Sequence, residues 1–248
     1  MGQFRHIFLL LLSVAFTFFS CSSESKTSLV VLTASGLKEP FNQLVEKYQK
    51  EHPEEEIKVI YGGSGNLLAL LEEGKGDLFI PAGEFYINLA LKRNLIDPST
   101  VRELTQFVPV LVVKESFASK VKDLKDLVKV PLRIGLGDPK AASIGRVSKR
   151  ILEKAGIWNL LRDKIVVKTA TVSQLLVYLK TGQIDATIIW KHLVRNLKGF
   201  KVIPITEPYL VVEKVEVSVS KATKHKREAE SFEIFLLENR KFFDKTFR

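Results

Sequence analysis

Residues 57–80 read IKVIYGGSGNLLALLEEGKGDLFI, and this stretch decides the fold class of the chain. Residues 57–61 are mostly β-branched or aromatic, which predicts a strand. The glycine-rich turn 62–65 follows, and leucines then recur at helical spacing until the glycines at 74 and 76. A second short apolar run, 77–80, closes a strand–helix–strand unit. Such a unit predicts parallel strands with a helix packed on one face.

The same alternation of short apolar runs and helical periods extends along most of the chain. We therefore predict an α/β fold in which mainly parallel sheets are flanked by helices. The predicted strands are 29–32, 57–61, 77–80, 107–113, 132–136, 165–167, 185–189, 201–205 and 210–219, and the predicted helices lie around 37–48, 67–71, 85–93, 121–128, 147–152, 172–180 and 224–243.

The N-terminus has the pattern of an export signal. Arg5 precedes an almost wholly apolar run, 7–19, which is too short to span a bilayer but suits the core of a signal peptide. We predict a signal peptide at 1–20 and a polar linker at 21–28. Cys21, the one cysteine of the chain, follows Ser20 in a way that resembles the lipobox of bacterial lipoproteins. Lipid attachment at Cys21 and ordinary signal cleavage both place the mature protein in the periplasm or at the cell surface.

The chain is basic, with 38 Lys and Arg against 28 Asp and Glu and a formal net charge of +10. Acidic residues are interspersed among the basic ones, so the pattern favours a solvated basic surface. Together with export, this argues against a nucleic-acid partner. A positive field would instead help to draw in small anions.

Three predicted strand-to-helix turns share one composition: 33–36, 62–65 and 137–145. Each offers backbone amides at the start of a helix, and the first two add the hydroxyls of Ser35 and Ser64. Helix N-termini carry partial positive charge and bind anions. In parallel sheets, ligands bind beyond the carboxyl ends of the strands, where these turns lie. One such turn alone is commonly structural, but three in successive units favour an anion site.

Other chemistries find little support. The four histidines are far apart and lack metal-ligand spacing, so we expect no metal site, and no hydrolase or nucleotide-binding motif is present. We expect no catalytic residue and no cofactor. Asp138, which precedes a proline, is more typical of a turn than of a catalytic acid. Arg146 fits an anion contact and a solvated surface position about equally well.

Five segments, in order, carry a resemblance to a known family: TASGLKEPF (33–41), YGGSG (61–65), GDLFI (76–80), IGLGDPK (134–140) and GQIDA (182–186). The mature chain resembles the molybdate-binding proteins of ABC transporters, which have the type II periplasmic-binding fold. This resemblance implies two lobes with a ligand cleft between them, formed by 29–107 plus 208–248 and by 108–207. It also implies hinge crossings near 108–114 and 210–219.

The resemblance further implies the ligand-binding residues. Ser35 and Ser64 would donate hydroxyls, Ile144 and Val172 would donate backbone amides, and Trp190 stands where the family has a tyrosine. An indole can donate one hydrogen bond but cannot accept one. The implied ligand is therefore a fully ionised oxyanion, molybdate or tungstate.

The implied partners are an ABC permease and, through the lipid anchor, a membrane, with the protein itself a monomer. Three other functions stay open at this point. A receptor for sulfate or an organic anion is the closest rival. A hydrolase with Ser64 as nucleophile lacks a histidine in any of the three turns. A regulatory ligand-sensing domain lacks a helix-turn-helix segment and conflicts with export.

Overall fold

The computed structural model describes residues 26–247, with side chains described up to 243. The predicted signal peptide 1–20, the predicted lipidation site Cys21 and most of the predicted linker lie outside the described residues. The first strand begins at Thr27, so the last two residues of the predicted linker 21–28 belong to a strand.

Ten strands and eight α-helices alternate along the described chain. The strands are β1 Thr27–Ala34, β2 Glu55–Gly62, β3 Leu78–Ile80, β4 Arg102–Phe107, β5 Pro109–Lys114, β6 Ile134–Gly137, β7 Ile165–Thr169, β8 Ala186–Trp190, β9 Phe200–Pro204 and β10 Glu213–Val219. The helices are α1 Lys38–Glu51, α2 Ser64–Glu72, α3 Glu84–Lys92, α4 Asp126–Lys129, α5 Ser143–Lys154, α6 Val172–Lys180, α7 Lys226–Glu238 and α8 Arg240–Phe247. Short 3-10 helices are η1 Ser35–Leu37, η2 Pro98–Thr100, η3 Glu115–Phe117, η4 Asn159–Lys164 and η5 Lys191–Val194.

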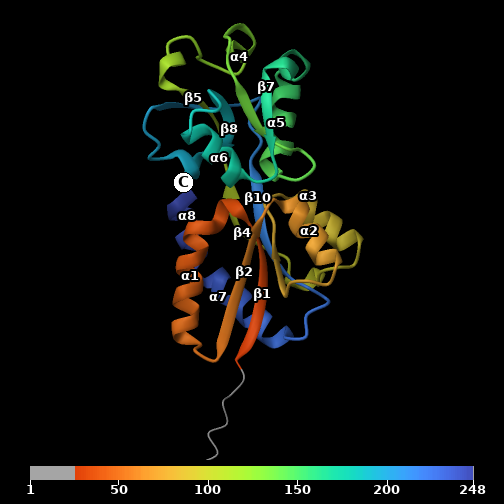
Figure 1. Cartoon of the computed structure of the whole chain (residues 1–248). Coiled ribbons are helices and arrows are strands. Elements are labelled where there is room, and N and C mark those ends of the chain that lie inside the picture. Colours follow the sequence, from red (N-terminus) through yellow and green to blue (C-terminus); the bar gives the residue numbers. More distant parts are fainter. Residues whose placement is uncertain (1–25, 248) are drawn as a thin grey trace, which may run out of the picture.

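The strands form two five-stranded sheets, each the centre of one lobe (Figure 1). The first has the order β2-β1-β3-β10-β4 and the second β7-β6-β8-β5-β9. The α/β, two-lobed prediction is confirmed, and four of the five strands in each sheet run in the same direction. In each, the first three strands are parallel and the other two pair antiparallel. The strand that runs against the others is β10 in the first lobe and β5 in the second.

Two chain segments cross between the lobes. The strand predicted at 107–113 is two strands in different sheets, separated by Val108. Phe107 ends β4 and pairs with Glu213 in the first sheet, whereas Pro109 begins β5 and pairs with Trp190 in the second. The second crossing, 205–212, joins β9 to β10, so the strand predicted at 210–219 starts later, at Glu213.

Two predicted helices also differ from the structure. Of the helix predicted at 121–128, only α4 is helical, and it starts at Asp126. The C-terminal helix predicted at 224–243 is two helices, α7 and α8, which meet at Asn239. The second of them, α8, packs against β4 and touches η5 of the other lobe.

Helices cover both faces of the first sheet because its strands are apolar on both sides. Along β1, Val31 belongs to a large cluster with α1 and α7, whereas the next residue, Leu32, belongs to a smaller cluster with α2 and α3. This alternation follows from the two-residue period of a strand. The larger cluster continues into the second lobe, through Phe107 and Trp190.

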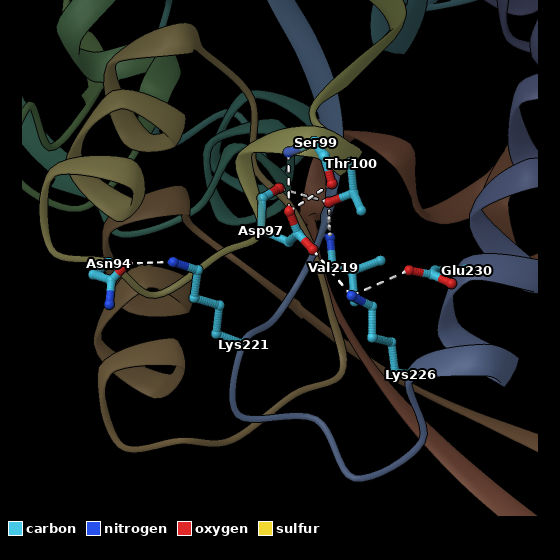
Figure 2. Close-up of polar contacts among 8 residues, drawn as sticks. All are labelled: Asn94, Asp97, Ser99, Thr100, Val219, Lys221, Lys226 and Glu230. Atoms are coloured by element: carbon cyan, nitrogen blue, oxygen red, sulfur yellow. Dashed lines mark hydrogen bonds and ion pairs between the residues drawn. The ribbon is translucent and has the colours of Figure 1, made fainter.

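A polar cluster ties the loop after α3 to the C-terminal part of the first lobe (Figure 2). The Asp97 carboxylate accepts hydrogen bonds from the backbone N–H of Ser99 at 3.0 Å and its hydroxyl at 2.6 Å, and pairs with Lys226 Nζ at 3.2 Å. The Thr100 hydroxyl accepts from the backbone N–H of Val219 at 2.9 Å. These contacts fix the end of β10 beside η2, away from the cleft.

Candidate functional site

A small cavity lies between the two lobes, and all five predicted ligand-binding residues border it. Its volume is ≈ 20 Å³, little more than the roughly 10–15 Å³ that one water molecule needs. The lining residues are Ala34, Ser35, Gly36, Gly62, Gly63, Ser64, Ala82, Phe107, Ala142, Ser143, Ile144, Val172 and Trp190. Each of them is uncharged, so any charge on a ligand would be balanced by backbone and hydroxyl dipoles.

The first lobe contributes two turns at the carboxyl ends of β1 and β2. Ser35 follows β1 directly, is 7% exposed, and its hydroxyl has no hydrogen-bond partner among the described residues. Ser64 begins α2 and is 2% exposed. Its hydroxyl accepts from the Ala82 backbone N–H at 3.1 Å and donates to the Ala82 carbonyl oxygen at 3.2 Å. The single proton of the Ser64 hydroxyl is therefore directed at Ala82, while the backbone amide of Ser64, the first residue of α2, has no partner within the helix and borders the cavity.

The second lobe contributes the N-termini of α5 and α6. Helix α5 starts at Ser143 after Ala142, whose side chain cannot cap it, so the amides of Ser143 and Ile144 have no partner within the helix. Helix α6 starts at Val172, and its cap, Thr171, accepts from the backbone N–H of Gln174 at 3.2 Å. The Thr171 hydroxyl bonds to the amide of Gln174, the third residue of α6. The amide of Val172, the first residue of the helix, therefore has no partner within the helix and borders the cavity.

An aromatic wall closes the cavity near the first crossing. Trp190, the last residue of β8, is 1% exposed and lies 5.2 Å from Phe107, centroid to centroid. The His192 ring lies 4.7 Å from Phe107, and its Nε2 is 3.0 Å from the carbonyl oxygen of Gly36 in the other lobe. Burial lowers the pKa of His192 to about 4, so the imidazole is neutral at pH 7. A neutral imidazole with its proton on Nε2 donates this hydrogen bond.

The two lobes are in direct backbone contact beside the cavity. The Gly65 N–H donates to the Ala141 carbonyl oxygen at 2.9 Å. A Cβ atom on Gly63 would lie 2.1 Å from the carbonyl oxygen of Ala170 and 2.6 Å from that of Ala141. Gly63 and Gly65 therefore permit an approach of the lobes that a residue with a Cβ atom would not allow.

Two residues weighed from the sequence lie outside the cavity. The Arg146 guanidinium stacks on the Phe85 ring, 3.3 Å from its centroid, in a separate, larger interlobe cavity. The Asp138 carboxylate accepts the backbone N–H of Lys140 at 2.9 Å, which is the turn role that the sequence favours.

Several residues that border the cavity were not predicted from the sequence. Ser143 was not singled out within the 137–145 turn, and Ala82 and Phe107 were given no role. The Pro-Ala-Gly turn after β3 was a possible signal for Ala82, because it follows a third strand of the same sheet. Phe107 comes to the cavity only because the chain changes sheets after it.

Among the described residues, one group of metal-ligating side chains lies close together: His52, Glu54 and Glu55. It lies at the start of β2, the end opposite the cavity, and the Glu55 carboxylate already accepts from the Tyr48 hydroxyl at 2.9 Å. Within residues 26–247, no helix has the length and apolar character needed to cross a membrane.

Two α/β lobes that enclose a cavity of helix N-termini and hydroxyls define a solute-binding protein of the periplasmic type. A family model for bacterial extracellular solute-binding proteins matches residues 29–247, and the chain belongs to this family.

Individual relatives agree with this assignment. The chain is 34% identical to a "Putative binding protein" of Haemophilus influenzae over 220 residues, 86% of each chain. It is 30% identical over 227 residues to the "Putative ABC transporter substrate-binding lipoprotein YvgL" of Bacillus subtilis, covering 88% of this chain and 84% of the relative. It is 24% identical to the molybdate-binding protein ModA of Escherichia coli over 203 residues, 79% and 78% of the two chains.

Solved structures show the same fold. The substrate-binding domain of a putative molybdenum ABC transporter from Clostridium difficile matches with a TM-score of 0.66 at 27% identity, covering 90% of this chain and 98% of that one. The sulfate-binding protein SubI of Mycobacterium tuberculosis matches with a TM-score of 0.76 at 14% identity, covering 89% and 86%. The chain is thus a substrate-binding protein of the ABC-transporter type, related to ModA.

Proposed function

We propose that this protein is the extracytoplasmic receptor of an ABC importer and that it binds a small tetrahedral oxyanion, molybdate or tungstate, between its lobes. The observation that carries the proposal is the cavity itself: small, uncharged, and bordered by helix N-termini from both lobes. A cation would find no carboxylate there.

The cavity also favours a fully ionised anion. The groups that border it are mainly donors: the backbone amides of Ser64, Ser143, Ile144 and Val172 and the indole N–H of Trp190, together with the Ser35 hydroxyl, which can donate or accept. A protonated oxyanion such as hydrogen phosphate would place its own O–H against an N–H donor, or would turn a serine hydroxyl from donor to acceptor, at a cost of about 1–3 kcal/mol.

Size argues against the organic-anion alternative. A cavity of ≈ 20 Å³ would have to widen for a tetrahedral oxyanion and would have to widen further for a larger carboxylic acid, and the bulky rings of Trp190 and Phe107 line it. Sulfate carries the same charge and shape as molybdate and is the remaining rival, which only measured affinities separate. The relationship to ModA favours molybdate.

The protein is further proposed to carry a lipid on Cys21 after removal of the signal peptide. Its proposed partner is an ABC permease, and the protein itself is proposed to be a monomer. The relative of Bacillus subtilis that carries the word lipoprotein in its name supports this proposal. Metabolic labelling with a fatty acid tests it: label should enter the wild-type protein and be absent from Cys21→Ser.

Calorimetry of the purified mature protein against molybdate, tungstate, sulfate, phosphate and organic acids tests the ligand. We expect molybdate and tungstate to bind, sulfate to bind more weakly, and phosphate at pH 7 not to bind. Native mass spectrometry should show one oxyanion per chain. Tight binding of a neutral solute or of an organic acid, without any oxyanion, would refute the proposal.

A further inference from the structure

Three serine hydroxyls border the cavity, and their hydrogen bonds differ. The Ser64 hydroxyl is held by Ala82 on both sides, at 3.1 and 3.2 Å. A hydroxyl has one proton to donate. For Ser64 to donate to a ligand, it would have to leave the buried carbonyl oxygen of Ala82 without this partner. The hydroxyls of Ser35 and Ser143, by contrast, have no hydrogen-bond partner among the described residues.

Ser143 lies where a hydroxyl from the second lobe can reach the ligand. It is the first residue of α5, it borders the cavity, and it is 6% exposed. Its Oγ lies 3.2 Å from the position that a Cβ atom on Gly83 would take, so it reaches the Ala82–Gly83 turn of the first lobe. An anion oxygen in the cavity would supply the Ser143 hydroxyl with an acceptor.

We propose that Ser143 is a ligand-binding residue whose hydroxyl donates a hydrogen bond to the oxyanion. One serine from each lobe, Ser35 and Ser143, then binds the ligand through its hydroxyl. On this proposal Ser64 holds the Ala82 turn in place and contributes its backbone amide. The inference rests on the proposed function, since it concerns the same cavity. It adds a side-chain donor from the second lobe, and this donor engages only when the lobes close.

The test compares single serine variants by calorimetry with molybdate and tungstate. In Ser143→Ala, affinity should fall roughly 10–100-fold, as expected for the loss of a hydrogen bond to a charged group, and Ser35→Ala should behave alike. Ser64→Ala should instead lower the unfolding temperature of the ligand-free protein, because Ala82 loses its partner, with a smaller loss of affinity than Ser143→Ala.

Ser148→Ala is the matched control. Ser148 belongs to the same helix, is 0% exposed and also has an unpartnered hydroxyl, but it does not border the cavity. Its substitution should leave oxyanion affinity unchanged. Ser143→Cys keeps the size of the side chain and replaces the hydroxyl by a weak donor, so it should fold normally and still lose affinity.

The outcomes separate the two proposals. A wild-type protein that binds no oxyanion refutes the proposed function itself. A wild-type protein that binds molybdate, together with Ser143→Ala and Ser143→Cys variants of unchanged affinity, overturns only the role of Ser143. A loss of affinity in Ser148→Ala as large as in Ser143→Ala would also overturn it, because the effect would then come from the helix and not from the hydroxyl.

Discussion

The backbone N–H of Gly65 in one lobe donates a hydrogen bond to the carbonyl oxygen of Ala141 in the other, with N and O 2.9 Å apart. The contact joins the first turn of α2 to the loop before α5, beside two of the helix N-termini that border the cavity. In this structure, the same approach of the lobes that forms the contact also brings the donors of both lobes to one cavity.

Gly63→Ala should prevent full closure. The new Cβ would lie 2.1 Å from the Ala170 carbonyl oxygen, and both backbones would have to separate. Gly63 has φ −74° and ψ 142°, which alanine adopts freely, so the fold of the first lobe should be intact. We expect much weaker oxyanion binding with faster dissociation, and no ligand-induced decrease in the radius of gyration by small-angle X-ray scattering.

Gly156→Ala provides the contrasting control for this prediction. A Cβ there meets nothing within 4 Å, but φ is +71°, so the variant should lose some stability and still close and bind normally. Wild-type affinity in Gly63→Ala would show that the lobes need not approach this closely when ligand is bound.

His192 should make the closed form sensitive to acid. Burial is the largest cause that lowers its pKa, from 6.5 to about 4, and Arg195 adds to the effect. Because the folded pKa is depressed, the unfolded chain binds the proton more readily between these values. Stability is therefore full above pH 6.5 and falls as the pH drops towards 4, by up to about 3 kcal/mol.

Urea unfolding at a series of pH values from 7.5 to 4 measures this dependence. His192→Gln keeps a donor for the Gly36 carbonyl oxygen but cannot be protonated, so its stability should fall less over the same range. Equal slopes for wild type and variant would show that other groups cause the acid sensitivity.

Glu213 should lower the stability of the protein at high pH, whereas His192 lowers it at low pH. This residue begins β10 at the second crossing, and burial raises the pKa of its carboxyl to about 7, against the opposing effect of Arg146 and Arg150. A raised pKa means that the folded protein prefers the protonated carboxyl. The contribution to stability is full below the unfolded value of 4.5 and is lost as the pH rises through about 7.

Glu213→Gln mimics the protonated form permanently. We expect the variant to be more stable than wild type at pH 8, by up to about 3 kcal/mol, and similar to it at pH 5. Thermal unfolding at the two pH values tests this. A variant that is less stable than wild type at pH 8 would indicate that the ionised carboxylate is held by the two arginines after all.

The sequence predicts the local units of this fold well and the lobe crossings poorly. The unit at 57–80 is confirmed because its strand, its turn glycines and its leucine spacing are all local features. The run 107–113 reads as one strand because apolar residues continue through Val108. Only the pairing of Phe107 with Glu213 and of Pro109 with Trp190 shows that it serves two sheets.

The residues of the cavity can likewise be predicted from the sequence only in part. Turn composition identifies three of the segments that meet there, and the structure places Ser35, Ser64 and Ile144 around one cavity. The sequence does not predict which of the serine hydroxyls is free to bind a ligand. The bonds of Ser64 to Ala82 depend on how the turn after β3 packs, and no pattern in either segment encodes that distance.

Trp190 sets the size of the cavity, so its replacement should change which anions bind. In Trp190→Tyr, the smaller ring would enlarge the cavity beside Phe107, and the phenol would bring a group that accepts as well as donates. We expect hydrogen phosphate to bind this variant more strongly than it binds wild type at pH 7, because its O–H would gain an acceptor beside the serine hydroxyls. Trp190→Phe opens similar space without a hydroxyl and separates the two effects. It should bind molybdate more weakly than wild type, since the indole N–H is gone, and should still exclude phosphate. Phosphate binding in both variants would mean that volume alone selects the ligand, whereas phosphate binding in neither would mean that the wall at Trp190 does not take part in selection.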